Sequence, residues 1–195
     1  MHIVTIVLAA GSSSRMGTSK QLLDIKGEPM LVQTVKTVLA CKTENIVVVL
    51  GSQAAHHAKL LEALPVDVIE NPVWNKGIGS SIKKGLTHAL TMEPNTDGVL
   101  FLVCDQPYLT GELVNAFIKY NGSKSIFSAY YDGSPGVPAL FTKKHFNEIL
   151  ALEDHLGAKK IIQNHLDETD FIDFSRGMID LDTPEDYQNY LKQAD

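Results

Sequence analysis

The chain has 195 residues, a length that fits one domain with a single buried core. Hydrophobic residues make up 44% of it and charged residues 21%, which excludes a disordered or low-complexity protein. The net charge of −6 argues against a nucleic-acid binder, because such proteins gather Lys and Arg on one face.

The first apolar stretch covers residues 3–9 and leads directly into a polar loop. It is too short for a membrane-spanning helix and lacks the cleavage site of a signal peptide, so we expect a cytoplasmic protein with no membrane partner. Cys41 and Cys104 have neither the spacing of a zinc site nor the density of a disulfide framework. We therefore expect two reduced thiols.

The loop after this stretch reads Gly11-Ser12-Ser13-Ser14-Arg15-Met16-Gly17-Thr18-Ser19-Lys20. Its Gly and Ser residues let backbone N–H groups approach anionic oxygens closely, and Arg15 and Lys20 add positive charge. The spacing fits neither the Walker pattern nor the dinucleotide fingerprint. The loop predicts a triphosphate site of another kind, with an ordinary Gly/Ser turn and two solvated cations as the alternative.

Strand and helix signals alternate along the first half of the chain. Further continuous apolar runs at 46–50, 66–69 and 98–103 are typical of strands covered on both faces. Helical periodicity separates the runs, at 30–39, 53–63 and 78–91, with Pro29 in the first turn of the first helix. This order predicts a mainly parallel sheet whose ligands bind beyond the carboxyl ends of the strands.

The run Gly77-Ile78-Gly79-Ser80-Ser81 predicts a loop that opens the third helix. Serine hydroxyls at such a place can donate to or accept from the edge of a nucleobase. The alternative is structural, with Ser80 capping the helix and Trp74 anchoring the core.

Asp105 follows the apolar run at 98–103, which would deliver its carboxylate to the strand end nearest the first loop. Mg²⁺ binds through one or two carboxylates together with phosphate oxygens and waters, so Asp105 predicts a magnesium site. A plain turn after the strand is the alternative. Cys104 is interpreted as a small residue that ends the strand, without chemistry of its own.

Residues 125–142 differ from the preceding half because two extended segments surround a turn at 132–136. They predict an antiparallel or mixed addition to the sheet. Pro138 lacks an N–H group, so 137–141 is predicted as an edge strand or a bulge. Further helices are predicted at 143–152, 157–165 and 184–192, with a short strand near 170–174.

The segment Asp180-Leu181-Asp182-Thr183-Pro184-Glu185-Asp186 offers a second acid, Asp182, that could complete a metal site. Alternatively, Asp182 or Thr183 caps the helix that begins at Pro184. The seven histidines show no metal-ligand spacing, and we expect them at the surface or at helix caps.

The pattern Leu8-Ala9-Ala10-Gly11-x-Ser13-x-Arg15-Met16-Gly17-x-x-Lys20 resembles the signature of nucleotidyltransferases that build activated sugars, alcohols and cofactors. It is most similar to the molybdopterin nucleotidyltransferases. The segments around Ser81, Asp105 and Asp182 resemble the base-recognition and metal-binding elements of that family. The resemblance implies one domain over residues 1–195, with a Rossmann-like, three-layer αβα fold.

The resemblance also implies a reaction, in which a phosphate on the acceptor attacks the α-phosphorus of a nucleoside triphosphate and pyrophosphate leaves. Arg15, Lys20 and Asp105 would be catalytic, and Asp105 and Asp182 would bind Mg²⁺. An acceptor phosphate is already anionic, so no general base is expected. The nucleotide-binding residues would be Leu8, Ala9, Ala10, Gly11, Ser12, Ser13, Arg15, Lys20, Gly79, Ser80, Ser81 and Asp105.

Ala10 matches the cytidylyl branch, whereas the guanylyl branch usually carries a second Gly there, so CTP is the expected nucleotide and Mo-molybdopterin the expected acceptor. Gly136, Pro138 and Lys159 would bind the acceptor, although this chain has Gly136-Val137-Pro138 for Gly-His-Pro and Lys159 for Arg. These departures leave open a sugar- or polyol-phosphate nucleotidyltransferase, a molybdopterin guanylyltransferase, or a noncatalytic nucleotide-binding module in cofactor delivery. A recipient molybdoenzyme or its chaperone is the implied protein partner.

Overall fold

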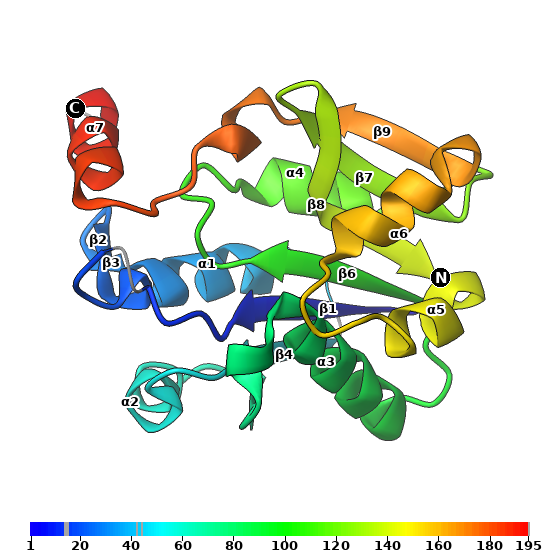
Figure 1. The fold of residues 1–195 in the computed structure, drawn as a ribbon, viewed down its shortest axis with the longest axis horizontal. Coiled ribbons are helices and arrows are strands. Elements are labelled where there is room, and N and C mark those ends of the chain that lie inside the picture. The colour runs from blue at the N-terminus through cyan, green and yellow to red at the C-terminus, as the bar shows by residue number, and fades with distance from the viewer. Residues whose placement is uncertain (14–15, 42, 44, 195) are drawn as a thin grey trace.

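The computed structural model describes residues 1–13, 16–41, 43 and 45–194. Its centre is one large sheet, ordered β5-β4-β1-β6-β8-β7-β9 (Figure 1). A separate small hairpin pairs β2, Asp24–Ile25, with β3, Glu28–Pro29. The strands of the large sheet are β1 (Ile3–Ala9), β4 (Asn45–Leu50), β5 (Asp67–Glu70), β6 (Gly98–Val103), β7 (Ile126–Tyr131), β8 (Ser134–Thr142) and β9 (Thr169–Asp173).

Strand direction divides this sheet into two regions. β5, β4, β1 and β6 are parallel neighbours, as the alternation of apolar runs and helices predicts. β8 is antiparallel to both β6 and β7, and β9 returns parallel to β7. A tight turn joins β7 to β8 and forces the reversal, since parallel neighbours need a long crossover. The mixed addition predicted for 125–142 is confirmed.

Pro138 lies in an interior strand, so its assignment to an edge strand is wrong and its assignment to a bulge is correct. β8 sits between β6 and β7. The register with β7 shifts there, because Ser128 pairs with Ala139 while Ala129 pairs with Gly136. Pro138 falls within the shifted part of β8, where a residue without an N–H group costs no ladder hydrogen bond.

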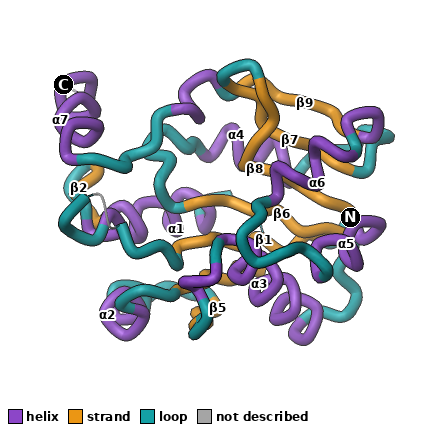
Figure 2. The backbone as a smooth tube through the Cα atoms, viewed as in Figure 1, coloured by secondary structure: helices purple, strands orange, loops and turns teal. Residues whose placement is uncertain are grey.

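Helices cover both faces of the sheet, and their alternation with the strands is visible in Figure 2. Residues of α1, α2, α4 and α7 pack in one apolar core, and residues of α3, α5 and α6 pack in a second core on the opposite face. This three-layer arrangement confirms the predicted fold class. The helices are α1 (Met30–Leu39), α2 (Ala54–Lys59), α3 (Ile78–Met92), α4 (Gly111–Ile118), α5 (Phe146–Leu150), α6 (Ala158–Asn164) and α7 (Pro184–Ala194).

Some element boundaries differ from the sequence-based expectations. α2 ends at Lys59, before the predicted residue 63, and the chain then turns toward Pro65. β5 is an edge strand whose residues are alternately exposed, so it is not covered on both faces. Pro29 lies in β3 and immediately precedes α1. Within the described ranges, no helix has both the length and the apolar character to cross a bilayer.

Candidate active site

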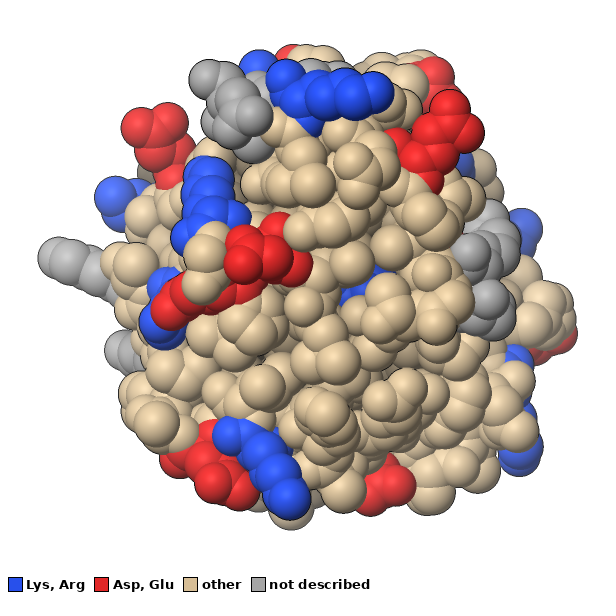
Figure 3. All heavy atoms as spheres, turned by 90° about the vertical axis from the view of Figure 1, so that its left-hand side faces the viewer, with Lys and Arg blue, Asp and Glu red and all other residues tan. Residues whose placement is uncertain are grey.

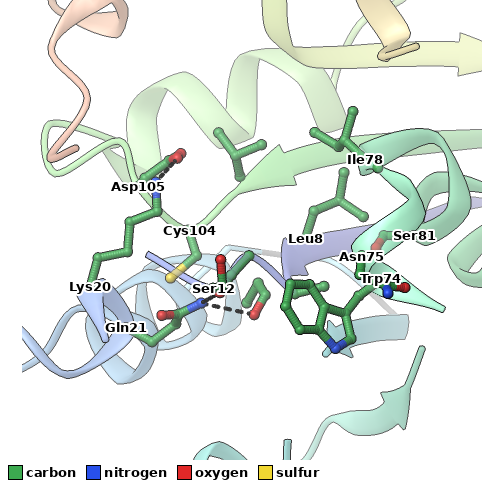
Figure 4. Close-up of a pocket in the computed structure, with 15 residues that line it drawn as sticks. Leu8, Ser12, Lys20, Gln21, Trp74, Asn75, Ile78, Ser81, Cys104 and Asp105 are labelled. Atoms are coloured by element: carbon green, nitrogen blue, oxygen red, sulfur yellow. Dashed lines mark hydrogen bonds and ion pairs between the residues drawn. The ribbon is translucent and has the colours of Figure 1, made fainter. Parts of the chain in front are cut away.

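A cavity of about 320 Å³ opens at the carboxyl ends of β1 and β6, a size in the range of small-ligand sites (Figure 4). This is the position predicted from the parallel strand order. Its wall is formed by Leu8, Ala9, Ala10, Gly11, Ser12, Lys20, Gln21, Trp74, Asn75, Gly77, Ile78, Ser81, Val103, Cys104 and Asp105.

The cavity has two chemically different ends. Lys20 and Asp105 lie at one end, where they form an ion pair (Figure 4). Trp74 and Ser81 lie at the other end, on the segment that opens α3. Trp74 thus lines the cavity and is only partly buried, which contradicts its alternative role as a core anchor. An ionic end and an aromatic end suit a ligand that carries phosphates on one side and a flat ring on the other.

Lys20 joins two carboxylates that are distant in sequence. Its Nζ lies 2.5 Å from Oδ2 of Asp105 and 3.0 Å from Oδ1 of Asp182. Burial alone would lower the pKa of Lys20, but the Asp105 carboxylate and then Asp182 outweigh it and raise the pKa. The ammonium group therefore stays charged at neutral pH and holds the two acids together.

The acids grouped around Lys20, of which Asp105 lines the cavity, fit a hard divalent cation. Asp105 and Asp182 already share one cation, the ammonium group of Lys20. Desolvation and the nearby Asp105 carboxylate raise the pKa of a third acid, Asp180, to about 7. Carboxylate oxygens that converge on one cationic position are the donors that Mg²⁺ prefers. The residues present are therefore suited to hold magnesium.

Thr183, rather than Asp182, caps α7. The hydroxyl of Thr183 accepts from the backbone N–H of Asp186 at 3.2 Å, and the Asp186 carboxylate accepts from the backbone N–H of Thr183 at 2.8 Å. This reciprocal pair is a capping box. It leaves the Asp182 carboxylate directed at Lys20, so capping does not account for Asp182.

Gln21 holds the start of the first loop through hydrogen bonds to its backbone. Its Nε2 donates to the carbonyl oxygens of Ala9 at 3.1 Å and Gly11 at 3.0 Å. Its Oε1 accepts from Ser19 Oγ at 2.7 Å. Ser19 Oγ also shares a hydrogen bond with Nε2 of His57 at 2.8 Å. A buried chain of polar groups thus ties α2 to the loop.

A second network orients the hydroxyl of Ser81. Asn71 Nδ2 donates to Ser80 Oγ at 2.9 Å and to Ser81 Oγ at 3.0 Å. Ser80 turns away from the cavity and donates to the carbonyl oxygen of Gly77 at 2.7 Å. Ser81 lines the cavity, and its oxygen is already engaged as an acceptor, so its proton is available for a ligand.

The other residues predicted to bind the nucleotide differ in their positions relative to the cavity. Leu8, Ala9, Ala10, Gly11 and Ser12 line the cavity, whereas Gly79 and Ser80, although described, are not part of its wall. Ser13 accepts from the backbone N–H of Lys20 at 2.9 Å and thus shapes the loop. Arg15 lies outside the described residues.

The residues predicted to bind the acceptor gather on β8 and α6, away from the cavity wall. Lys159 is exposed and donates to Ser134 Oγ at 2.9 Å, at the start of β8. Gly136 and Pro138 are buried in the same strand. Gln106, which follows Asp105, connects this region to the ionic end of the cavity by donating to the carbonyl oxygen of Val137 at 3.1 Å.

Sequence reasoning missed Gln21, Asn71 and Asp180. Gln21 and Asn71 each make their contacts with backbone or hydroxyl groups brought near by folding, so no spacing pattern marks them. Asp180 was one of several acids in its segment, and only its position near Asp105 distinguishes it. Figure 3 views this end of the molecule, where charged side chains of both signs lie mainly toward the edge of the face.

Together, the parallel α/β fold, the first loop and the acidic pair around Lys20 define a nucleotidyltransferase. Residues 5–169 match the MobA-like NTP transferase domain, and the chain belongs to this family.

The chain is also similar to two curated relatives, and it shares its fold with a solved structure. The chain is 30% identical to a molybdenum cofactor guanylyltransferase of Vibrio cholerae, over 95% of this chain and 89% of that protein. It is 28% identical to the purine catabolism protein PucB of Bacillus subtilis, over 95% and 94% of the two chains. The crystal structure of Rv0371c from Mycobacterium tuberculosis has the same fold, with a TM-score of 0.85, 24% identity and 98% coverage of both chains.

Proposed function

We propose that this nucleotidyltransferase transfers CMP from CTP to Mo-molybdopterin, releases pyrophosphate and forms molybdopterin cytosine dinucleotide. The observation that carries the proposal is the convergence of Asp105 and Asp182 on Lys20, which together with Asp105 lines one end of the cavity, opposite Trp74 and Ser81. Phosphates at the ionic end and the base at the aromatic end would place the α-phosphorus between them.

The chemistry asks mainly for charge neutralisation and alignment. An oxygen of the acceptor phosphate forms a bond to the α-phosphorus, and the bond from that phosphorus to the bridging oxygen of pyrophosphate breaks. Mg²⁺, held by Asp105 and Asp182, would neutralise phosphate charge. Lys20 supplies a permanent cation at the same end, and Gln21 keeps the loop carbonyls turned away from the phosphates.

Two features support CTP as the donor. The Ser81 hydroxyl oxygen accepts from Asn71 and keeps its proton for a ligand, and cytosine offers two acceptors, the ring nitrogen N3 and the exocyclic oxygen O2. Ala10 lines the cavity where the guanylyl branch usually has glycine, and its methyl group reduces the space for a purine. The relative named molybdenum cofactor guanylyltransferase supports molybdopterin as the acceptor.

That same relative favours a second candidate, transfer of GMP from GTP to molybdopterin. The two candidates share the ionic end of the cavity and differ only at the end that contacts the base. Nucleotide preference therefore separates them without further assumptions about the acceptor.

The test is pyrophosphate release with Mo-molybdopterin and each of CTP, GTP, ATP and UTP, with and without Mg²⁺. We expect Mg²⁺-dependent turnover that is at least tenfold faster with CTP. Asp105→Asn should lower turnover far more than tenfold while CTP still raises Tm, because the substitution removes a charge and keeps the shape. Lys84→Gln, an exposed charge on α3, is the matched control and should leave turnover unchanged.

Faster turnover with GTP would overturn the assignment of the base and favour the second candidate. If turnover required a sugar or polyol phosphate in place of Mo-molybdopterin, the assignment of Mo-molybdopterin as the acceptor would be wrong. A noncatalytic module in cofactor delivery would bind the nucleotide but show no turnover with any acceptor. In that case Asp105→Asn would also leave the CTP-induced change in Tm unaltered.

A further inference from the structure

Two histidines and a glutamate converge at the opposite end of the sheet from the cavity. β8 ends at Thr142, which pairs with Gly98 at the start of β6, whereas the cavity lies at the end of β6. His145 follows β8, Glu148 lies in α5, and His165 directly follows α6. α5 and α6 are seen near the N-terminus in Figure 1. The spacing of these residues in sequence predicted no metal site.

The three side chains are close enough to share one ion. Their ligand atoms all lie within 4.8 Å of one another. Glu148 Oε2 is 2.7 Å from His165 Nε2 and 3.7 Å from His145 Nδ1. Ligand atoms around a tetrahedral zinc ion are separated by about 3.4 Å, because each lies about 2.1 Å from the metal. Side-chain shifts of less than about 1 Å would therefore give the required separations.

Ser125 supports His145 on the side away from Glu148. Its Oγ lies 2.8 Å from Nε2 of His145 and 2.7 Å from Glu168 Oε2. A neutral ring that carries its proton on Nε2 offers the Nδ1 lone pair, on the side of Glu148, to a metal ion. A carboxylate that orients a ligand histidine through a second group is typical of metal sites in proteins.

We propose that His145 Nδ1, His165 Nε2 and the Glu148 carboxylate form a binding site for a divalent transition-metal ion of the zinc class. Two imidazoles and one carboxylate suit Zn²⁺ in ligand type and number, with water as the fourth ligand. Binding through Nε2 of His165 replaces its hydrogen bond to Glu148, and the neutral ring then carries its proton on Nδ1. The ion also places a positive charge beside the Glu148 carboxylate, 3.7 Å from Nδ1 of His145.

The exposure of two of the ligands and the hydrogen bond that anchors His165 favour a stable metal site. The side chain of His145 is 2% exposed, whereas those of His165 and Glu148 are 29% and 37% exposed, so an ion can enter from their side. The backbone of His165 is anchored because its carbonyl oxygen accepts from Thr169 Oγ1 at 2.7 Å. The ion would link α5, the end of α6 and the segment after β8. It would stabilise the fold and take no part in nucleotidyl transfer.

The test is titration of the protein with Zn²⁺ by calorimetry and with Co²⁺ by visible absorption. The background is Asp105→Asn combined with Asp182→Asn, which removes the acids of the active site. We expect one equivalent per chain, and a Tm increase of at least about 5 °C at a hundredfold excess over Kd. His165→Asn and Glu148→Gln should each weaken binding at least tenfold and remove the Co²⁺ absorption.

His155→Asn is the matched control, because exposed His155 also lies near a glutamate, with Nδ1 3.6 Å from Glu153 Oε2. It should bind Zn²⁺ like its background. In the otherwise natural chain, His165→Asn should leave CTP turnover unchanged, which separates this site from the proposed function. Binding that survives both site variants, that is lost with His155→Asn, or that is absent in the background would overturn the proposal.

Discussion

His57 contacts the first loop through a hydrogen bond with Ser19. The His57 side chain is buried, and its Nε2 lies 2.8 Å from Ser19 Oγ. Ser19 Oγ in turn donates a hydrogen bond to Gln21. Burial and the neighbouring His56 lower the pKa of His57 from 6.5. The folded protein therefore keeps this imidazole neutral under conditions in which an exposed histidine takes up a proton.

This pKa shift predicts an acid-sensitive fold. The unfolded chain binds a proton at His57 near pH 6.5, while the folded chain binds it only at lower pH, so the stability is present above pH 6.5 and is lost as the pH falls. Thermal unfolding from about pH 7.5 to about pH 5.5 should show a falling Tm in the natural chain. His57→Gln, which keeps an N–H donor but cannot be protonated, should reduce this fall.

His56→Gln is the control, because His56 is exposed on the same helix. It should retain most of the pH dependence of the natural chain. If His56→Gln and His57→Gln changed the pH dependence equally, the buried position of His57 would not be the cause.

Single residues differ in how far the sequence reveals them. Asp105 comes two residues after an apolar strand, and Lys20 ends the Gly/Ser loop that follows another, so their positions in the sequence predict chemistry. Residue type alone does not separate Asp182 from Thr183, since both residue types cap helices. The structure decides because Asp186 takes Thr183 as its partner. The spacing Thr183-x-x-Asp186 is that of a capping box, so the signal that favours Thr183 as the cap was present in the sequence.

At the level of elements, the start of α3 is set by its contact with the segment at 153–156. Gly77 has φ of +128°, and the backbone N–H of Gly79 donates to the carbonyl oxygen of Asp154 at 2.9 Å. A Cβ atom on Gly79 would lie 2.3 Å from the carbonyl oxygen of Glu153 and 2.6 Å from that of Leu156. Both obstacles are backbone, so glycine is required for this approach.

Gly79→Ala should therefore lower the free energy of unfolding by about 1–3 kcal/mol and weaken CTP binding, because α3 carries Ser81. Gly111→Ala is the control. Gly111 also lies in the first turn of a helix, but its Cβ would meet only Cys41 Sγ at 3.6 Å, so stability should be unchanged or slightly raised. Urea unfolding and CTP calorimetry measure both effects. Equal losses in the two variants would contradict the packing argument.

Long, strongly patterned elements were predictable, and short ones were less so. β1, β6 and α3 begin and end within a residue of their predicted bounds because their apolar patterns are long. α4 was not predicted, since it has only eight residues and is fixed by the Thr110 cap, which accepts from the backbone N–H of Leu113. Its packing against the sheet is a tertiary effect that local periodicity does not show.

Over the whole molecule, strand direction followed from connection length. The strands separated by helices became parallel neighbours, and the pair joined by a turn became antiparallel. The sequence could not show that β8 would enter the interior of the sheet, since that depends on which edge of β6 remains free. The candidate active site lies mainly at the parallel part of the sheet, which explains why Lys20 and Asp105 could be proposed from the sequence and then lie together in the fold.

The two apolar cores share one sheet, so the prediction of one domain over residues 1–195 implies a single cooperative unfolding transition. Leu31 of α1 and Leu86 of α3 are fully buried on opposite faces. Leu31→Ala and Leu86→Ala should each lower the free energy of unfolding by about 2–5 kcal/mol. In each variant, Trp74 fluorescence and far-UV circular dichroism should shift together in urea. If either substitution separated the two signals, the faces would unfold as independent units and the single-domain interpretation would be wrong.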